Sequence, residues 1–229
     1  MQKNLPLNGL LLVEKAAGST SFHLVSLLRR ITGIEKIGHA GTLDPFATGV
    51  MVMLIGREYT QKSDLFLTSD KEYRATLTLG IATDTYDLDG RVTTRSDIQP
   101  TETQVKEALQ AFQGKILQTP PMFSAKKVQG KKLYDLARKG ITVERRPVEV
   151  ELKTTLLSYN YPYLEIEVAC SKGTYIRSIA HELGEKLGCG AHLSSLSRTR
   201  SGSFRLADCI PQSHLTNLQF DIAPYLRHL

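Results

Sequence analysis

The chain has 229 residues, enough for one large domain or two small ones with a sizeable hydrophobic core. Hydrophobic residues make up 41% and charged residues 23%, which is ordinary for a soluble globular protein, and the longest apolar runs are too short to cross a membrane. The net charge is +6, and only four consecutive apolar residues, Leu10–Val13, follow the N-terminus, too few for a secretory signal. We therefore expect a cytoplasmic protein.

The first predicted elements are a strand and a helix. Residues Gly9–Val13 form a short apolar run that predicts a strand. Thr20 or Ser21 then offers an N-cap for an amphipathic helix that ends near Gly33. Its apolar residues recur at helical spacing: Phe22, Val25, Leu28 and Ile31.

A loop with a single acid follows this helix. The stretch Gly38–Gly49 contains three glycines, a proline and two threonines, which is typical of a loop, and Val50–Ile55 after it predicts a buried strand. Asp44 lies in the loop between Leu43 and Pro45. A carboxylate on a tight loop before a core strand can be held stiffly toward a cleft. The alternative is a Leu-Asp-Pro turn in which the aspartate caps its own backbone.

The middle of the chain is predicted to alternate between strands, turns and short helices. Residues Glu72–Leu79 alternate in polarity, as in a half-buried strand. The acidic stretch Asp84–Gly90 lacks the first and last acids of a calcium loop, so a turn at Asp89 and Gly90 is the better interpretation. A short helix is expected over Val105–Phe112, and the prolines within Gln118–Ser124 indicate an extended segment.

The positive charge is concentrated in residues Lys126–Arg146, which include a short predicted helix that ends at Gly140. The segment carries eight basic residues against Asp135 and Glu144, so its charge is 8 − 2 = +6 and the rest of the chain sums to zero. The basic residues are Lys126, Lys127, Lys131, Lys132, Arg138, Lys139, Arg145 and Arg146. One concentrated basic surface indicates a polyanionic partner, first of all nucleic acid, although a solvated helix and loop would give the same pattern.

The last third of the chain is predicted to contain a hairpin, a helix and a long strand. Val148–Leu157 and Tyr163–Ala169 read as the two strands of the hairpin. A helix is expected to start at Ser171–Thr174, His192–Phe204 is strand-like, and Pro211–Leu229 should be a terminal helix or a loosely packed tail. Strands outnumber helices, so the fold class is α+β with a mixed, largely antiparallel central sheet flanked by helices.

Several kinds of site are excluded by missing motifs. There is no Walker A loop, no G-x-G-x-x-G fingerprint and no G-x-S-x-G elbow. The stretch His181–Glu185 resembles a zincin helix but ends in glutamate, and three widely spaced cysteines, without a C-x-x-C pair, indicate neither a zinc site nor a disulfide. We expect no metal and no cofactor, which leaves cofactor-free chemistry on nucleic acid.

Six motifs in the same order resemble those of the TruB family, the tRNA pseudouridine-55 synthases. The loop Gly38–Gly49, as G-H-A-G-T-L-D-P-F-A-T-G, is similar to the family's catalytic motif. The other five resemble its K-P-x-G-x-T-S, strand tyrosine, T-D-T-x-D, P-P-x-F-S-A-x-K…G-x-x-L-Y and C-S-x-G-T-Y-I-R-S motifs: Lys15–Ser21, Tyr73–Ala75, Thr83–Asp87, Pro120–Tyr134 and Cys170–Ser178. Ala16 departs from the pattern, since the family has a proline there.

The resemblance implies a pseudouridine synthase-like catalytic domain that isomerises a uridine at position 55 in the T loop of tRNA. The uridine would be flipped out of the loop, its glycosidic bond would break, and its C5 would join C1′ without a cofactor. Asp44 would be the catalytic residue, either as nucleophile at C1′ or C6 or as base. Arg177 would pair with Asp44, although a surface ion pair of little value is the plain alternative.

The resemblance also assigns residues that contact the RNA. Tyr73 would stack on the flipped uracil, Tyr175 and Leu196 would line its pocket, and Asp87 would hydrogen-bond in or beside it. For the first three, core packing is the ordinary alternative. His39, on the loop of Asp44, would fill the space that the base leaves. The basic segment would hold phosphates of the stem.

The expected organisation is a catalytic domain over residues 1–210 and a short C-terminal tail over 211–229. Most bacterial members of the family continue into an RNA-binding module of the PUA type, for which this tail is too short. We expect a monomer whose partner is the T arm of tRNA, with no membrane contact. Two rival hypotheses are a non-catalytic RNA-binding protein and a metal-dependent nuclease that uses Asp84, Asp87 and Asp89.

Overall fold

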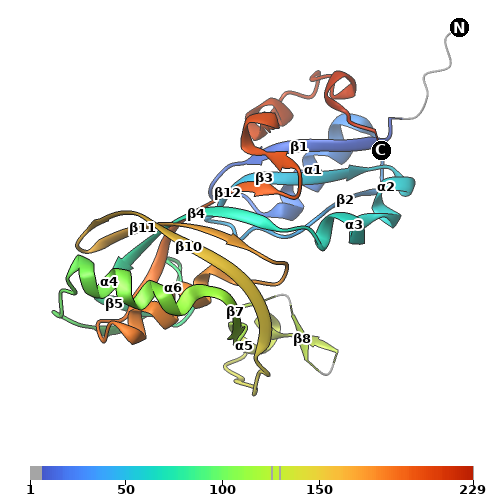
Figure 1. Cartoon of the computed structure of the whole chain (residues 1–229). Helices are drawn as coiled ribbons and strands as arrows, with labels where there is room; N and C mark the ends of the chain where they lie inside the picture. Colours follow the sequence, from blue (N-terminus) through green and yellow to red (C-terminus); the bar gives the residue numbers. More distant parts are fainter. Residues whose placement is uncertain (1–6, 125, 129, 229) are drawn as a thin grey trace, which may run out of the picture. The chain divides into compact units, whose positions relative to one another are not determined.

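The computed structural model describes residues 7–124, 126–128 and 130–228, which fall into two compact units (Figure 1). The first unit comprises the chain up to Tyr73 and from Ser197 onward, and the second comprises Arg74–Leu196. Two strands, β4 (Lys71–Leu79) and β12 (Ala191–Ser201), run from one unit into the other. Within the described residues, no helix is both long and apolar enough to span a membrane.

The first unit is built on a sheet with the strand order β14-β1-β3-β12, with β2 beside β3 and β13 beside β12. Strands β1 and β3 are antiparallel, and their register runs from Gly9 opposite Ile55 to Lys15 opposite Gly49. The elements of the unit, apart from β4 and β12, are β1 (Gly9–Lys15), α1 (Ser21–Thr32), β2 (Ile37–His39), β3 (Thr48–Ile55), α2 (Arg57–Gln61), α3 (Ser63–Leu67), β13 (Phe204–Arg205), η2 (Leu206–Asp208), β14 (Ile210–Pro211), η3 (Gln212–Thr216) and η4 (Ala223–Tyr225).

Helix α1 has the predicted ends, and Val25 and Leu28 of its predicted apolar face are buried. The Thr20 hydroxyl accepts a hydrogen bond from the His23 amide at 3.1 Å, and Gly33 closes the helix with φ +70°. The buried apolar residues are Leu24, Val25, Leu27 and Leu28. Phe22 is 62% exposed, so its predicted place on the buried face is wrong: the buried stripe lies one step around the helix.

Strand β3 is buried along its whole length after Thr48, as the apolar run predicted. Its first glycine, Gly49, lies opposite Arg198 of the parallel strand β12. A Cβ atom on Gly49 would lie 2.2 Å from the Arg198 carbonyl oxygen, and the φ of +105° is one that only glycine adopts readily. Glycine is therefore required at the point where the loop of Asp44 enters the core.

The second unit has the strand order β12-β4-β11-β10-β7, and α4 packs against β10 and α6. The predicted hairpin is confirmed: β10 and β11 are antiparallel, from Leu152 opposite Cys170 to Asn160 opposite Tyr163. The elements, apart from β4 and β12, are β5 (Ile81–Thr83), β6 (Val92–Arg95), α4 (Glu102–Leu109), η1 (Gln110–Phe112), β7 (Gln113–Gln118), β8 (Lys127–Val128), β9 (Lys131–Lys132), α5 (Leu133–Ala137), β10 (Val148–Asn160), β11 (Tyr163–Cys170) and α6 (Ile176–Lys186).

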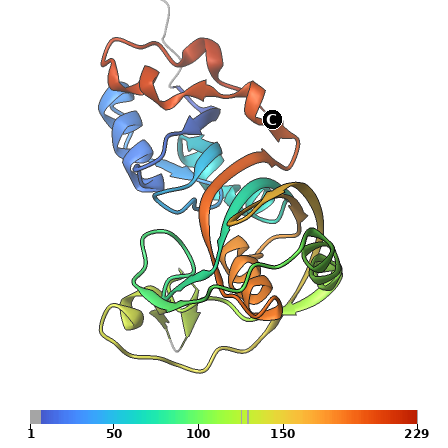
Figure 2. The ribbon, with the colours of Figure 1, turned by 90° about the vertical axis from the view of Figure 1, so that its left-hand side faces the viewer.

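The C-terminal segment is neither a helix nor a loose tail. It forms short 3-10 turns, and Leu215 and Ile222 are almost completely buried. The turn η3 packs against α1 and β1, and both views of the ribbon show this red segment beside blue α1 (Figures 1 and 2). The fold class is confirmed as α+β with a largely antiparallel sheet. The expected domain boundary after residue 210 stays a prediction.

Candidate active site

In the first unit, Asp44 lies on the loop between β2 and β3 and is half-buried. The loop is fixed to the start of α1, because the Ser21 hydroxyl donates to the Leu43 carbonyl at 3.1 Å and accepts from the Leu43 amide at 3.0 Å. A turn closes directly after the acid, where the Ala47 amide donates to the Asp44 carbonyl at 3.1 Å. The backbone on both sides of the carboxylate is therefore held, which limits the positions that the side chain can take.

Lys15, at the end of β1, is a buried cation that holds the same loop. Its ammonium donates to the carbonyls of Ser19 at 2.6 Å, Ala16 at 2.9 Å and Pro45 at 3.0 Å. Burial lowers the pKa of Lys15 to about 8; the carboxylate of Asp44 opposes this shift and the guanidinium of Arg198 adds to it. Lys15 thus ties β1 to the residue that follows Asp44 and places a positive charge near the carboxylate.

Arg198, on β12, is a second buried cation and is only 1% exposed. Its Nε donates to the Val50 carbonyl at 2.8 Å, and its Nη2 donates to the Gly41 carbonyl at 3.2 Å and approaches the Met51 sulfur at 3.1 Å. Gly41 precedes Asp44 and Val50 follows it. A single guanidinium therefore joins the two ends of the loop of Asp44.

His39, the last residue of β2, lies beside this loop and is half-buried. Among the described residues its Nδ1 is buried and has no hydrogen-bond partner. Burial, together with the nearby Arg198 guanidinium, lowers the pKa of His39. The ring is therefore neutral near pH 7, which favours contact with a base over contact with a phosphate.

Sequence reasoning assigned no role to Lys15 or Arg198. In the sequence Lys15 is only the first residue of a motif, although a lysine at the end of a largely apolar strand is a detectable signal. Arg198 stands in a stretch rich in serine and arginine, where nothing in the sequence distinguishes it from Arg200. Arg200 is bound elsewhere, at 2.8 Å from the carboxylate of Glu72, beside Tyr73 on β4. Tyr73 itself is half-buried.

In the second unit, Arg177 and Asp87 form a buried ion pair with side chains that are each 7% exposed. The Arg177 Nη1 lies 3.3 Å from the Asp87 Oδ2, and the guanidinium also donates to the carbonyls of Thr85 at 3.1 Å and Phe123 at 2.8 Å. Burial excludes the alternative of a weak surface ion pair. Arg177 and Asp44 belong to different units, and their expected pairing stays a prediction.

The turn that carries Asp87 is closed by its own carboxylate. The Asp87 Oδ1 accepts from the Thr85 hydroxyl at 2.6 Å and from the Asp89 amide at 3.1 Å. The predicted turn at Asp89 and Gly90 is confirmed, because the Gly90 amide donates to the Asp87 carbonyl at 3.3 Å. The acids here hold protein donors, and no group of three or more His, Cys, Asp or Glu among the described residues could hold a metal ion.

Tyr86, between these residues, has φ +67°, a conformation that is rare for tyrosine. Its ring stacks on His181, one helical turn after Arg177 on α6, with a centroid distance of 3.8 Å and an angle of 7° between the ring planes. The Leu193 amide donates to the Tyr86 carbonyl at 3.0 Å. The turn is therefore held by α6 on one side and by β12 on the other.

Tyr175 and Leu196, the remaining predicted residues, also lie in the second unit. Tyr175 directly precedes α6, and its amide and carbonyl are both bound by the side chain of Gln118, at 2.7 and 3.1 Å. Gln118 is 1% exposed, and sequence reasoning missed it because one glutamine in an extended segment carries no signal. Leu196, on β12, is 6% exposed.

Comparisons with known proteins agree with these features. Residues 29–176 match the TruB family pseudouridylate synthase N-terminal domain, and residues 177–229 match the tRNA pseudouridylate synthase B C-terminal domain. The chain is 63% identical to the tRNA pseudouridine synthase B of Protochlamydia amoebophila, over 93% of this chain and 82% of that protein. It is 58% identical to the enzyme of the same name from Chlamydia muridarum, over 97% of this chain and 92% of that protein.

Among solved structures, a chain in the crystal structure of a Cbf5-Nop10-Gar1 complex matches with a TM-score of 0.70 and 29% identity. The match covers 89% of this chain and 52% of that chain, so this protein spans about half the length of that neighbour. The fold, the aspartate loop and these matches define the class: the chain is a pseudouridine synthase, an RNA-modifying isomerase. It belongs to the TruB family of pseudouridylate synthases.

Proposed function

We propose that this enzyme, which isomerises uridine to pseudouridine in tRNA, acts on the uridine at position 55 in the T loop. The observation that carries the proposal is the loop of Asp44, whose backbone is tied down by Ser21, Lys15 and Arg198. A fixed carboxylate of this kind suits a reaction that breaks one bond to C1′ and forms another. The T loop is the site implied by the family motifs.

Asp44 is proposed as the catalytic residue. Its carboxylate can act as the nucleophile that attacks the nucleoside, or as the base that removes a proton from it, and either role requires the ionised form. The buried cations Lys15 and Arg198 bind backbone carbonyls of the loop, and Lys15 places a positive charge near the carboxylate. They also make the position of the carboxylate independent of the RNA, because their hydrogen bonds lie within the protein.

The remaining roles concern the flipped nucleotide. We assign His39 to the space that the uridine leaves in the loop, which suits its neutral ring. Tyr73 is assigned to stacking on the uracil, and Tyr175 and Leu196 to contacts with the base. The expected partner of Asp44 is Arg177, whose guanidinium is oriented within the second unit by the ion pair with Asp87.

The test replaces Asp44 with asparagine and measures pseudouridine in a T-arm RNA by carbodiimide-dependent primer extension. Asp44→Asn removes the reactive group but keeps its size, so we expect isomerisation to fall at least about 1,000-fold while the Kd for RNA changes less than about 3-fold. Asp97→Asn is the matched control, because it makes the same change at an exposed acid and should keep full activity.

Four outcomes would overturn these assignments. Retained activity of Asp44→Asn would remove Asp44 from the mechanism. RNA binding by the wild type without turnover on any tRNA transcript would indicate a non-catalytic RNA-binding protein. Cleavage of the RNA chain with magnesium that stops with a chelator would indicate a nuclease. If pseudouridine forms at another tRNA position but not at position 55, the isomerase activity stands and the T-loop assignment is wrong.

A further inference from the structure

Strand β7 ends at a glutamine, Gln118, whose side-chain amide binds the backbone of Tyr175. Its Oε1 accepts from the Tyr175 amide at 2.7 Å, and its Nε2 donates to the Tyr175 carbonyl at 3.1 Å. One side chain therefore binds both polar backbone groups of one residue, as a neighbouring strand does in a sheet. Tyr175 is held at two points rather than one, which fixes the direction of its backbone.

Tyr175 needs a partner outside its own helix because it directly precedes α6. Its backbone is extended, with φ −105° and ψ 110°, and its own side chain makes no capping hydrogen bond. Amides at the start of a helix have no partner within the helix, and a phenol is not among the side chains that cap them. Lys172 and Gly173, just before it, are exposed, so the chain enters the helix from the solvent. Gln118 supplies the fixed contact at this point.

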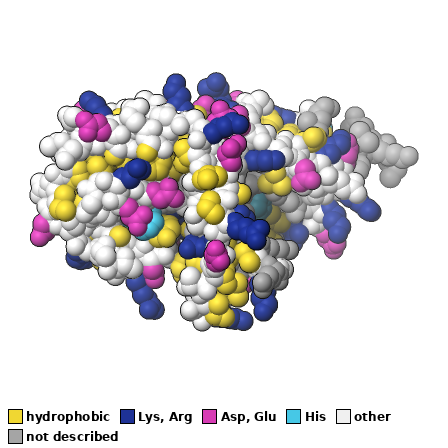
Figure 3. All heavy atoms as spheres, turned by 60° about the horizontal axis from the view of Figure 1, so that its bottom comes forward, with side chains coloured by type: hydrophobic (Ala, Val, Ile, Leu, Met, Phe, Trp, Pro, Cys, Tyr) yellow, Lys and Arg dark blue, Asp and Glu magenta, His cyan; other side chains and the backbone are white. Residues whose placement is uncertain are grey.

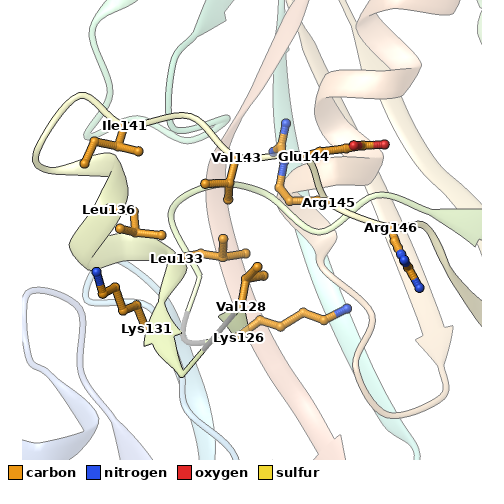
Figure 4. Close-up of a pocket in the computed structure, with 10 residues that line it drawn as sticks. All are labelled: Lys126, Val128, Lys131, Leu133, Leu136, Ile141, Val143, Glu144, Arg145 and Arg146. Carbon is orange, nitrogen blue, oxygen red and sulfur yellow. The ribbon is translucent and has the colours of Figure 1, made fainter.

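The segment that follows Gln118 is itself held by two other parts of the second unit. The Ser178 hydroxyl, in the first turn of α6, donates to the Thr119 carbonyl at 3.1 Å. The Arg145 Nη1 donates to the Pro120 carbonyl at 3.1 Å, and Figure 4 draws this arginine among the residues around a pocket of the second unit. Pro120 is buried, and its ring restricts φ. Gln118 is therefore attached to a rigid segment and can hold Tyr175 in one place.

Gln118 is itself out of reach of RNA, since only 1% of the residue is exposed. Lys and Arg side chains stand out from the surface drawn in Figure 3, and such cations supply many of the contacts that proteins make to phosphates. Tyr175 is half-buried, so part of it can meet a ligand. Any effect of Gln118 on the reaction must therefore pass through the residue that it holds.

We propose that Gln118 is a positioning residue of this isomerase: its amide fixes the backbone of Tyr175 and thereby the place of the Tyr175 ring against the target base. The proposal rests on the proposed function, which assigns Tyr175 to contacts with that base. A misplacement of about 1 Å in an active site can lower a rate about 100-fold. The affinity for tRNA comes mainly from phosphate contacts, which Gln118 does not make. Loss of the amide should therefore lower kcat and leave KM nearly unchanged.

The first residue of β7, Gln113, provides a matched control. Its Nε2 donates to the Thr154 carbonyl at 2.8 Å, and its Oε1 accepts from the Thr154 amide at 3.3 Å. The residue type, the strand and the kind of pairing are the same as for Gln118. Thr154 lies on β10 and has no assigned role in the reaction. The difference between equal substitutions at the two glutamines therefore measures what is specific to Tyr175.

The first test measures the steady-state kinetics of pseudouridine formation in a T-arm RNA. Gln118→Met keeps the length of the side chain and removes both hydrogen bonds to Tyr175, so kcat should fall about 10- to 100-fold while KM changes less than about 3-fold. Gln113→Met should stay within about 2-fold of the wild type in both constants. Gln118→Asn keeps the amide but is one methylene shorter and cannot bind both backbone groups, so it should lower kcat as well.

The second test follows the position of Tyr175 without RNA. The chain contains no tryptophan, so Tyr175→Trp introduces a single indole whose time-resolved fluorescence anisotropy reports the motion of that ring. Adding Gln118→Met should raise the amplitude of the nanosecond motion about 2-fold, because side chains that lose their constraints move on this timescale. Adding Gln113→Met should leave the amplitude unchanged.

Gln118 is not a positioning residue if Gln118→Met lowers kcat no more than Gln113→Met does, or if it raises KM alone. Equal anisotropy after Gln118→Met and Gln113→Met would also overturn the inference. If the wild type forms no pseudouridine, the proposed function fails, and the anisotropy still decides whether Gln118 fixes Tyr175. Thermal unfolding of Gln118→Met and Gln113→Met at similar temperatures establishes that folded proteins are compared. If Gln118→Met unfolds at a much lower temperature, the comparison is made between Gln118→Asn and Gln113→Asn.

Discussion

At the scale of single residues, the loop of Asp44 depends on two buried cations whose hydrogen bonds lie within the protein. Lys15 donates to three carbonyl oxygens and Arg198 to carbonyls on both sides of Asp44. Buried charges are costly unless such partners satisfy them. The loop thus carries its own counter-charges, and the carboxylate is held in place before RNA arrives.

This arrangement predicts a stability effect of pH through Lys15. The folded protein lowers the pKa of Lys15 from 10.5 to about 8, so between these two values the unfolded chain binds more protons than the folded one. The contribution of Lys15 to the free energy of unfolding must therefore rise with pH across this window and stay constant below it. The difference in that free energy between wild type and Lys15→Met should shift in favour of the wild type from about pH 8 to about pH 10.

Urea unfolding at a series of pH values measures this difference. Lys153→Met is the control, since Lys153 is exposed and its substitution should give a difference that does not change over the window. A pH-independent difference for Lys15→Met would mean that the ammonium is not desolvated in the folded state. If the wild type instead loses stability relative to Lys15→Met as the pH rises, folding raises the pKa of Lys15 and does not lower it.

Residue types and order were enough to single out Asp44 as a candidate, because it lies in a short recognisable motif. They were not enough for Arg198, since its role depends on burial between β3 and β12, strands that are far apart in the sequence. The same limit applies to Arg177. Its motif predicted a functional arginine, but the hydrogen bonds to the carbonyls of Thr85 and Phe123 exist only once α6 is folded against two loops.

At the scale of elements, the turn of Asp87 is held against α6 by a strained tyrosine. Tyr86 at φ +67° costs on the order of 1–3 kcal/mol, and its stacking on His181 is the contact that offsets this cost. Its two neighbours, Thr85 and Asp87, both bind the guanidinium of Arg177. The stacked rings therefore set the position of Arg177 from the side of the turn.

Substitutions of Tyr86 separate stability from activity. Tyr86→Gly removes the ring but also relieves the strained backbone, so the free energy of unfolding should fall by less than about 1 kcal/mol. The kcat for pseudouridine formation should fall about 10-fold at unchanged KM, because Arg177 is less well positioned. Tyr86→Phe keeps the stacked ring and should restore kcat. Steady-state kinetics on tRNA measure kcat and KM for both variants. An unchanged kcat in Tyr86→Gly would mean that the stacking of Tyr86 on His181 contributes to the structure and not to catalysis.

Elements with one clear periodicity were predicted well, and those fixed by tertiary contacts were not. The β10–β11 hairpin follows from alternation in adjacent segments. The short strand β2 and the C-terminal turns have no periodicity of their own, since β2 exists through its pairing with β3 and η3 through its packing on α1. Helix α1 was placed correctly, but Phe22 shows that spacing alone does not fix which stripe faces the core.

At the scale of the whole molecule, the order of strands was not predictable, because β4 and β12 each pair with segments distant in sequence. The distribution of charge was predictable, since it needs only the sequence. Residues Lys126–Arg146 carry a net +6 and the remainder is neutral. Other cations are already paired with acids, such as Lys106 with Glu102 and Lys115 with Glu149.

This distribution predicts which charges set the salt dependence of RNA binding. Each phosphate contact contributes about 0.7 to 0.9 to the slope of log K against log salt concentration, because binding releases counterions. Arg138→Ser/Lys139→Ser removes two exposed cations of the basic segment and should lower the slope by about 1 to 2. Lys106→Ser/Lys115→Ser makes an equal change in charge at cations held by glutamates and should leave the slope as in the wild type.

Filter binding of tRNA over a range of potassium chloride concentrations measures these slopes. Equal slopes for the two double variants would mean that the charge of the whole molecule acts on the RNA, rather than the charge of one segment. A lower slope for Arg138→Ser/Lys139→Ser alone would locate the phosphate contacts on the basic segment, Lys126–Arg146.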